Sequence, residues 1–414
     1  MTNVTTHHDQ TSMRRAGAWQ AALLLAGSCL PVLGSVLITP VLPQLSEHFA
    51  DVAGSEVLVP MIVAIPALMI AIFAPFAGQI VDRLGRKRLL IIAMFAYAVV
   101  GTAPAWLEGL TEILVSRVLV GICEAAIMTV CTTLIIDYFH EEHRRNKYLG
   151  LQTVATTLAA TVFIILGGAL GVGGWHVPFW VYAVSIVVAV PMIFSLWEPS
   201  AAESGGRRDA SAAKVPIPWR RIGVRLLVSL FGGFTFYVII IEASYLVVGT
   251  GIAATDTATI GLVAAVASLA TAIAGFTFAR LAKGRAGRLL PIAFGLQAVG
   301  MLVIWVVPGL PGVIAGAVIA SFGSGLLLPS LVTWVVASTQ FEERGRVTGW
   351  WTAAFFLGQF LTPILMGIIG AAAGGLATAV GIVGIASAVV AVLVGVALRR
   401  SAARESASPA AYTR

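Results

Sequence analysis

The chain has 414 residues, of which 58% are apolar and only 11% are charged, and its mean hydropathy is +0.95. An ordinary soluble domain is about half apolar and about a quarter charged, so the composition excludes such a domain and indicates a membrane protein. Twelve apolar segments follow one another along the sequence, and each is long enough to cross a bilayer as a helix.

The net charge of +7 and the pI near 9.7 would suit a nucleic-acid partner, but the placement of the bases argues against it. All Lys and Arg except Arg117 fall into seven patches that can face one side of a membrane. The patches are 14–15, 83–88, 144–147, 207–225, 280–288, 344–346 and 399–414. By the positive-inside rule both termini are cytoplasmic, and we expect a lipid bilayer and no nucleic acid as partner.

Residues 1–17 are polar and form the predicted N-terminal tail. The first apolar run, about 18–43, is longer than the apolar part of a signal peptide and is therefore interpreted as the first span. It contains three prolines, Pro31, Pro40 and Pro43. Proline is tolerated in a spanning helix that lines a cavity or packs on neighbours, so this helix is expected beside a cavity or another helix.

The stretch Gly78-Gln79-Ile80-Val81-Asp82-Arg83-Leu84-Gly85-Arg86-Lys87-Arg88 joins the predicted spans 55–77 and 89–107. An acid and four bases cannot lie in hydrocarbon, so this loop must sit at a membrane face. It resembles the loop between the second and third helices of the major facilitator superfamily, whose pattern is Gly-x-x-x-Asp-Arg-x-Gly-Arg-Lys/Arg-x. Every fixed position is filled, by Gly78, Asp82, Arg83, Gly85 and Arg86.

The resemblance implies a gating role for this loop. In the superfamily the motif's acid docks on the N-terminal end of the eleventh helix in the outward-open state, where a carboxylate gains about 0.3–1 kcal/mol from the helix dipole. Asp82 would be that acid here. The resemblance also implies that Arg86 pairs with Asp137, at the cytoplasmic end of the fourth span.

The remaining predicted spans are 113–137, 148–171, 177–197, 222–248, 258–279, 289–308, 311–338, 347–371 and 376–398. The two halves of the chain repeat: Gly275 to Lys283 aligns with Gly78 to Arg86 at an offset of 197 residues, with Ala279 in place of Asp82. The loop from Phe341 to Arg344 echoes the loop from Phe139 to Arg144 at an offset of 202.

We therefore predict an all-α membrane protein with 12 transmembrane helices in two pseudo-symmetric six-helix bundles. The bundles cover 18–197 and 222–398, joined by a cytoplasmic linker at 198–221 and followed by a cytoplasmic tail at 399–414. In transporters of this superfamily such repeats place the substrate site between the halves.

Charges inside the spans are costly, so each one is a candidate functional residue. Arg117 and Glu124 lie in the fourth span and Glu242 in the seventh, and the superfamily lines its cavity with spans 1, 4, 7 and 10. The run Arg117-x-x-x-Gly121 resembles a motif of proton-coupled exporters whose arginine is implicated in proton transfer. A buried carboxyl could load and release protons. The alternative is a static Arg117–Glu124 ion pair, although seven residues span about 10.5 Å of helix.

Other candidates for the pathway are apolar or aromatic, namely Met128, Phe234, Tyr237 and Tyr245. They favour a hydrophobic or amphiphilic substrate over an anion, because only one arginine is available to clamp a charge. Helix packing would explain the same side chains.

The predicted function is a secondary transporter that works by alternating access, with proton-coupled efflux of small organic molecules as the leading hypothesis. Thr161-Val162 stands where exporters of this type carry Gly-Pro, so an uptake permease or facilitator stays open, as does a non-transporting membrane sensor. No catalytic constellation, cofactor motif or metal-ligand cluster is seen, and Cys29, Cys123 and Cys131 lie in apolar segments. We expect a monomer in the cytoplasmic (inner) cell membrane, with a small-molecule substrate and protons as ligands.

Overall fold

The structure is a computed structural model that describes residues 16–199, 217–282, 286–340 and 343–406. Every regular element in these ranges is a helix, and twelve candidate spans are long and apolar enough to cross a membrane. The predicted all-α fold with 12 spans is thereby confirmed. Most of the predicted N-terminal tail, the linker core 200–216 and the end of the predicted C-terminal tail lie outside the described residues.

The first six spans consist of α1 (Ala18–Val36), η1 (Thr39–Val41) and α2 (Leu42–His48); α3 (Ser55–Phe73), η2 (Ala74–Phe76) and α4 (Ala77–Leu84); α5 (Arg86–Thr102) and η3 (Ala103–Ala105); α6 (Leu110–Tyr138); α7 (Glu142–Gly171); and η4 (Val177–Ala183) with α8 (Val184–Ser195). The other six are α9 (Trp219–Val248); α10 (Thr257–Ala282); η5 (Ala286–Leu289) with α11 (Leu290–Val306); α12 (Leu310–Val336); α13 (Arg344–Ala373); and α14 (Leu376–Ser406). Helix α14 thus continues into the predicted tail.

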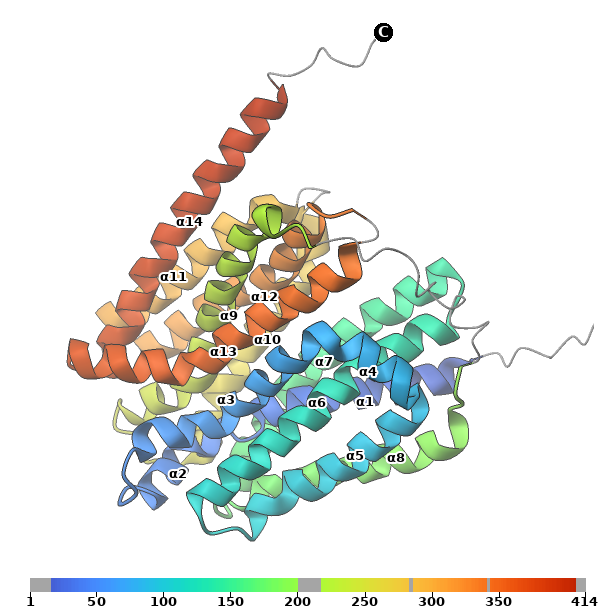
Figure 1. Cartoon of the computed structure of the whole chain (residues 1–414). Coiled ribbons are helices and arrows are strands. Elements are labelled where there is room, and N and C mark those ends of the chain that lie inside the picture. Colours follow the sequence, from blue (N-terminus) through green and yellow to red (C-terminus); the bar gives the residue numbers. More distant parts are fainter. Residues whose placement is uncertain (1–15, 200–216, 283–285, 341–342, 407–414) are drawn as a thin grey trace, which may run out of the picture.

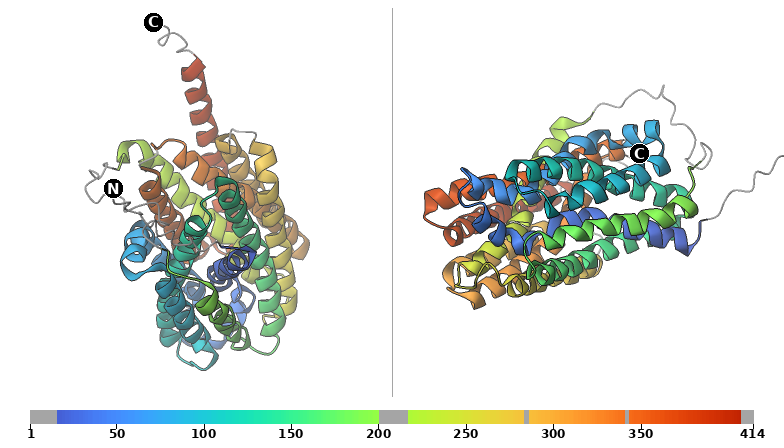
Figure 2. Two further views of the ribbon diagram at one scale, coloured as in Figure 1. Left: turned by 90° about the vertical axis from the view of Figure 1, so that its right-hand side faces the viewer. Right: turned by 90° about the horizontal axis from the view of Figure 1, so that it is seen from below.

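Successive spans run in alternating directions, which gives the molecule two faces. The ends that carry the arginine and lysine patches, among them Arg86, Arg144, Arg220 and Arg344, form what we call the basic face. The far face holds α2 and the turn between α9 and α10. In Figure 1 the ribbons of the two six-helix halves lie close together near α2 and diverge toward the basic face. Figure 2 shows the helices of each half gathered into one bundle.

Each half has its own apolar core, as expected when helices present apolar surface on several sides. One cluster fills the first half and includes Leu33, Leu134 and Phe179. Two clusters fill the second half, one around Val238 and Met301 and one around Phe294 and Leu331. The first-half cluster also contains Tyr237 and Ile241 of α9, so α9 is the helix through which the second half reaches into the first.

Two helix pairs join the halves along their edges, α3 with α13 and α7 with α10. At the second edge the backbones touch: a methyl group added at Gly168 would lie 2.7 Å from the Thr257 carbonyl oxygen and 2.9 Å from the Gly261 Cα. The Thr257 hydroxyl donates to the Gly168 carbonyl at 2.8 Å. At the first edge, Gly349 of α13 packs on the backbone of Ala74.

Aromatic rings cover the far face beside α2. His48 contacts Phe49 and Trp175 at ring-centroid distances of 4.7 and 5.3 Å, and His176 stacks on Trp175 at 3.5 Å. Burial lowers the pKa of His176, and the neighbouring His48 adds to this, while Glu108 opposes it. Amphipathic rings at this level are typical of a membrane–water interface.

The glycine contact between α7 and α10 predicts a specific sensitivity. Gly168→Ala should lower the thermal unfolding midpoint of the purified protein, because the added methyl cannot fit and overpacking costs about 1–3 kcal/mol. Gly150→Ala is the matched control on the same helix, since nothing lies within 4 Å of a methyl group there. Equal midpoints for the two variants would contradict the close contact.

Candidate functional site

Glu124 lies at the centre of the first half with its side chain fully buried. Neither carboxyl oxygen has a hydrogen-bond partner within the described part of the chain. The side chain extends from α6 and packs directly on Gly34 of α1. The contact is so close that a methyl group added at Gly34 would lie 1.7 Å from Oε1 of Glu124. Burying an unpaired charge costs several kcal/mol. The packing of the helices around Glu124 is therefore expected to differ between the charged and the neutral form of its carboxyl group.

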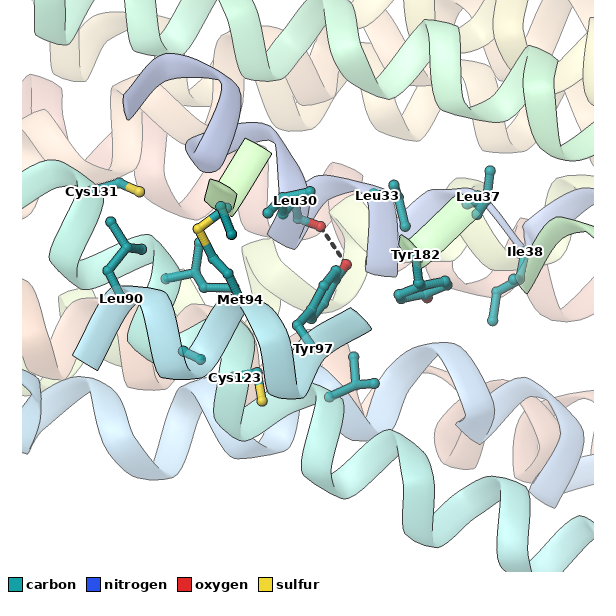
Figure 3. Packing of buried hydrophobic residues seen from close by; sticks show 14 of the residues in the cluster. Leu30, Leu33, Leu37, Ile38, Leu90, Met94, Tyr97, Cys123, Cys131 and Tyr182 are labelled. Atoms are coloured by element: carbon teal, nitrogen blue, oxygen red, sulfur yellow. Dashed lines mark hydrogen bonds between the residues drawn. The ribbon is translucent and has the colours of Figure 1, made fainter. Parts of the chain in front are cut away.

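Tyr97 of α5 lies beside this carboxyl group. Its hydroxyl donates to the Leu30 carbonyl of α1 at 2.6 Å, and Figure 3 shows the ring reaching from α5 toward that carbonyl. A methyl group at Gly34 would also lie 3.2 Å from the Tyr97 hydroxyl. Glu124 and Tyr97 therefore both face the turn of α1 from Leu30 to Gly34.

Arg117 is equally buried, but it does not pair with Glu124. Its Nη2 donates to the carbonyls of Val100 and Gly101 at 3.2 and 3.0 Å, and its Nη1 donates to the Tyr182 hydroxyl at 3.0 Å. Residue 104, four positions after Val100, is a proline, so the Val100 carbonyl has no helical N–H donor. Among the described residues no ion pair joins Arg117 to Glu124. The guanidinium supplies the missing donors at the end of α5.

Glu242 lies apart from this group. It is 5% exposed and lies on α9. Val238 and Leu246, one turn before and after it on the same helix face, both belong to the second-half cluster around Met301. Glu242 therefore points into the second half, and the structure does not bring it together with Glu124.

The other predicted pathway residues are divided between the halves. Phe234 is buried in the second-half core, and Met128 is half-buried on α6. The Tyr237 hydroxyl donates to the carbonyls of Ser35 and Val63 at 3.3 and 3.2 Å, and that of Tyr245 pairs with the Ser46 hydroxyl at 3.0 Å. Only Tyr237 reaches the segment of α1 next to Glu124.

The predicted gating loop lies at the basic face between α4 and α5. The expected ion pair between Arg86 and Asp137 is present. The structure adds Glu198, which sequence reasoning missed: its carboxylate accepts from the backbone N–H groups of Arg86 and Lys87 at 2.5 and 2.8 Å and so caps α5. Gly85 there adopts φ +82°, a conformation that favours glycine.

The other described motif residues, Gly78 and Arg83, lie at the surface. Arg83 is exposed, and a methyl group at Gly78 would meet no atom within 4 Å. The side chain of Asp82 lies outside the described residues, so its docking on α13 stays a prediction. The nearby turn η2 nevertheless packs against α13 through Ala74 and Gly349.

The second half contains a neutral counterpart of the Glu124 site. The Gln297 amide accepts from the Thr235 hydroxyl at 3.0 Å and donates to the Ser324 hydroxyl at 2.8 Å. Gln297 and Ser324 follow Tyr97 and Glu124 by 200 residues each, close to the offset of the internal repeat. The repeat could thus have located this polar group from the sequence. Here the oxygen and the nitrogen of the Gln297 amide each have a hydrogen-bond partner, whereas the carboxyl group of Glu124 has none among the described residues.

Removing the glycine beside Glu124 should displace the carboxyl group. Gly34→Ala is expected to lower stability by about 1–3 kcal/mol, because its methyl would overlap Oε1 of Glu124. The same change in a Glu124→Ala background should cost much less, since the space is then free. Thermal unfolding of the four proteins measures this coupling, and additive effects would contradict the contact.

The role of Arg117 can be separated from its charge. Arg117→Met should destabilise the protein by about 1–3 kcal/mol, because it leaves buried carbonyls without donors. Adding Pro104→Ala restores an N–H near the Val100 carbonyl and should recover part of the loss in thermal unfolding. No recovery would indicate that the guanidinium acts mainly through Tyr182.

The sequence profile of the Major Facilitator Superfamily matches residues 23–253 and 226–411. The tetracycline resistance protein, class H, of Pasteurella multocida is 28% identical over 42% of this chain and 43% of its own length. The multidrug efflux pump LfrA of Mycolicibacterium smegmatis is 29% identical over 43% of this chain and 34% of its own length. The chain thus matches less than half the length of these relatives.

A solved structure supports the same fold. The D-xylose–proton symporter superposes with a TM-score of 0.72 at 14% sequence identity, covering 92% of this chain and 97% of that one. The family match spans nearly the whole chain and agrees with the expectation of a transporter and not an enzyme. The chain belongs to the major facilitator superfamily of membrane transporters.

Proposed function

We propose that this protein exports small organic molecules, hydrophobic or amphiphilic in character, in exchange for protons, and that Glu124 carries the proton. The observation that carries the proposal is a fully buried carboxyl group with no hydrogen-bond partner among the described residues, in the middle of α6. Such a group is costly to keep in a membrane unless it is used. Relatives named as efflux and resistance proteins favour export over uptake.

The proposed cycle alternates access between two bodies, residues 18–197 and 222–398, in the cytoplasmic membrane with both termini inside the cell and one chain as the working unit. The loop with Asp82, Arg83 and Arg86 would close the basic face in the outward-open state, with Asp137 holding Arg86 in place. The neutral Thr235–Gln297–Ser324 group suits a second half that moves without titrating.

Transport in proteoliposomes tests the proposal. Lipophilic cations, neutral drugs and sugars would be offered to the purified protein with and without an imposed pH gradient. We expect gradient-driven movement of amphiphilic compounds by the wild-type protein. Glu124→Gln should lose the response to the gradient, because the amide cannot carry a proton, while keeping substrate binding.

Glu242→Gln is the matched comparison, since this acid is also buried but points into the second-half core. It should retain most gradient-driven transport. Transport by wild type that ignores the gradient would refute proton coupling, and equal loss in both variants would refute the special role of Glu124. If only sugars moved with the gradient, the proposed class of hydrophobic or amphiphilic substrates would be wrong.

A further inference from the structure

Helix α1 is broken within the membrane, close to the far face. It ends at Val36, and the chain continues through η1 into α2, which contains Pro43. Prolines at 40 and 43 have no N–H, so the carbonyls of Val36 and Thr39 lose the donors that a continuous helix would supply. Freed carbonyls at this depth must find other donors. The Thr39 hydroxyl donates to the Val36 carbonyl at 2.9 Å, and the Leu42 backbone N–H donates to the Thr39 carbonyl within the turn η1.

The second half of the protein supplies a further donor to this break in α1. The Ser244 hydroxyl of α9 donates to the Thr39 carbonyl at 2.7 Å, and both residues are buried. Two turns earlier on α9, the Tyr237 hydroxyl donates to the carbonyls of Ser35 and Val63. Ser35 lies in the last turn of α1, where carbonyls also lack helical partners. Both bonds join the halves on the far side of the molecule.

We propose that Tyr237 and Ser244 form a hydroxyl latch that holds the halves closed at the far face and that must open once in each transport cycle. This inference rests on the alternating-access function proposed above. Both hydroxyl groups are buried while the halves are together, so water can replace their bonds to the backbone of the first half only after the halves separate.

The latch and Glu124 act on the same stretch of α1. Tyr237 binds Ser35 from the second half, and the carboxyl group of Glu124 packs on Gly34, the preceding residue, from the first half. Tyr97 holds the Leu30 carbonyl one turn earlier. A movement of Glu124 toward or away from α1 therefore shifts the carbonyl to which the latch is bonded, and this links the proton site to the far gate.

The opening of the latch can be measured without a substrate. Ile241 lies on α9 between the two latch residues and is fully buried in the first-half core, so it becomes accessible only when the halves part. A protein with Ile241→Cys as its single cysteine, the native three replaced by alanine, would be labelled in nanodiscs with a hydrophilic maleimide. The labelling rate then follows the population of the open far side, even when it is small.

Ser244→Ala and Tyr237→Phe each remove one hydroxyl, and each should raise the labelling rate about three- to tenfold, the range expected for one net hydrogen bond. Two matched controls should leave the rate unchanged. Ser229→Ala removes a hydroxyl on the same helix that bonds only within α9, and Tyr148→Phe removes one without a hydrogen bond among the described residues. A separate protein that keeps only Cys131, buried in the first-half core, reports unfolding and should label at a constant slow rate.

Rates equal to wild type in both latch variants would overturn the latch, whatever the transport assay gives. Faster labelling in the controls as well, or at Cys131, would also overturn it, because the effect would then be general loosening. A wild-type protein without proton-coupled transport would refute the proposed function but leave this readout intact. Glu124→Gln should change the labelling rate when the latch is present and change it less in Tyr237→Phe, which lacks the bond to Ser35; equal changes would separate the latch from the proton site.

Discussion

A carbonyl group that loses its helical donor inside a membrane must be given another, and this requirement explains where the polar side chains of this protein lie. Proline at 104 removes the donor for Val100, and Arg117 supplies it. Proline at 43 removes the helical donor of Thr39, whose carbonyl accepts instead from the Leu42 N–H of the turn and from the Ser244 hydroxyl of the other half. The hydrogen bond from Arg117 stabilises the interior of the first bundle. The one from Ser244 adds a hydrogen bond between the two bundles.

The two halves use related positions in different ways. The first half places a carboxyl group without a partner against the bare backbone of Gly34. The second half fills the corresponding place with a hydroxyl and an amide that satisfy each other. A neutral group with its hydrogen bonds formed does not change its charge over the physiological pH range, whereas a carboxyl group has two charge states. In the proposed function this asymmetry gives the proton chemistry to the first half and the mechanical response to the second.

Composition predicted the spans, because hydrophobic length is a local property of the sequence, and the family resemblance of the charged turn implied the pair of Arg86 with Asp137. Contacts between distant helices could not be predicted in this way. Nothing in the sequence places Tyr97 beside Glu124 or Glu198 on the start of α5, since both depend on how helices cross. Arg117 was assigned to proton transfer by resemblance. The structure gives Arg117 a structural role instead: it donates to the Val100 carbonyl, which lacks a helical donor because residue 104 is a proline. This contact depends on how α5 and α6 cross and could not be read from the sequence.

The contact between α7 and α10 has a further consequence for motion. At Gly168 and Gly261 the two halves touch through bare backbone, with no side-chain ridges to disengage. Helices that meet through interlocked ridges must exchange rotamers to change their crossing angle, but two smooth surfaces can roll on each other. This edge of the molecule therefore sets the separation of the two bundles through close backbone contact, to which the Thr257 hydroxyl adds one hydrogen bond.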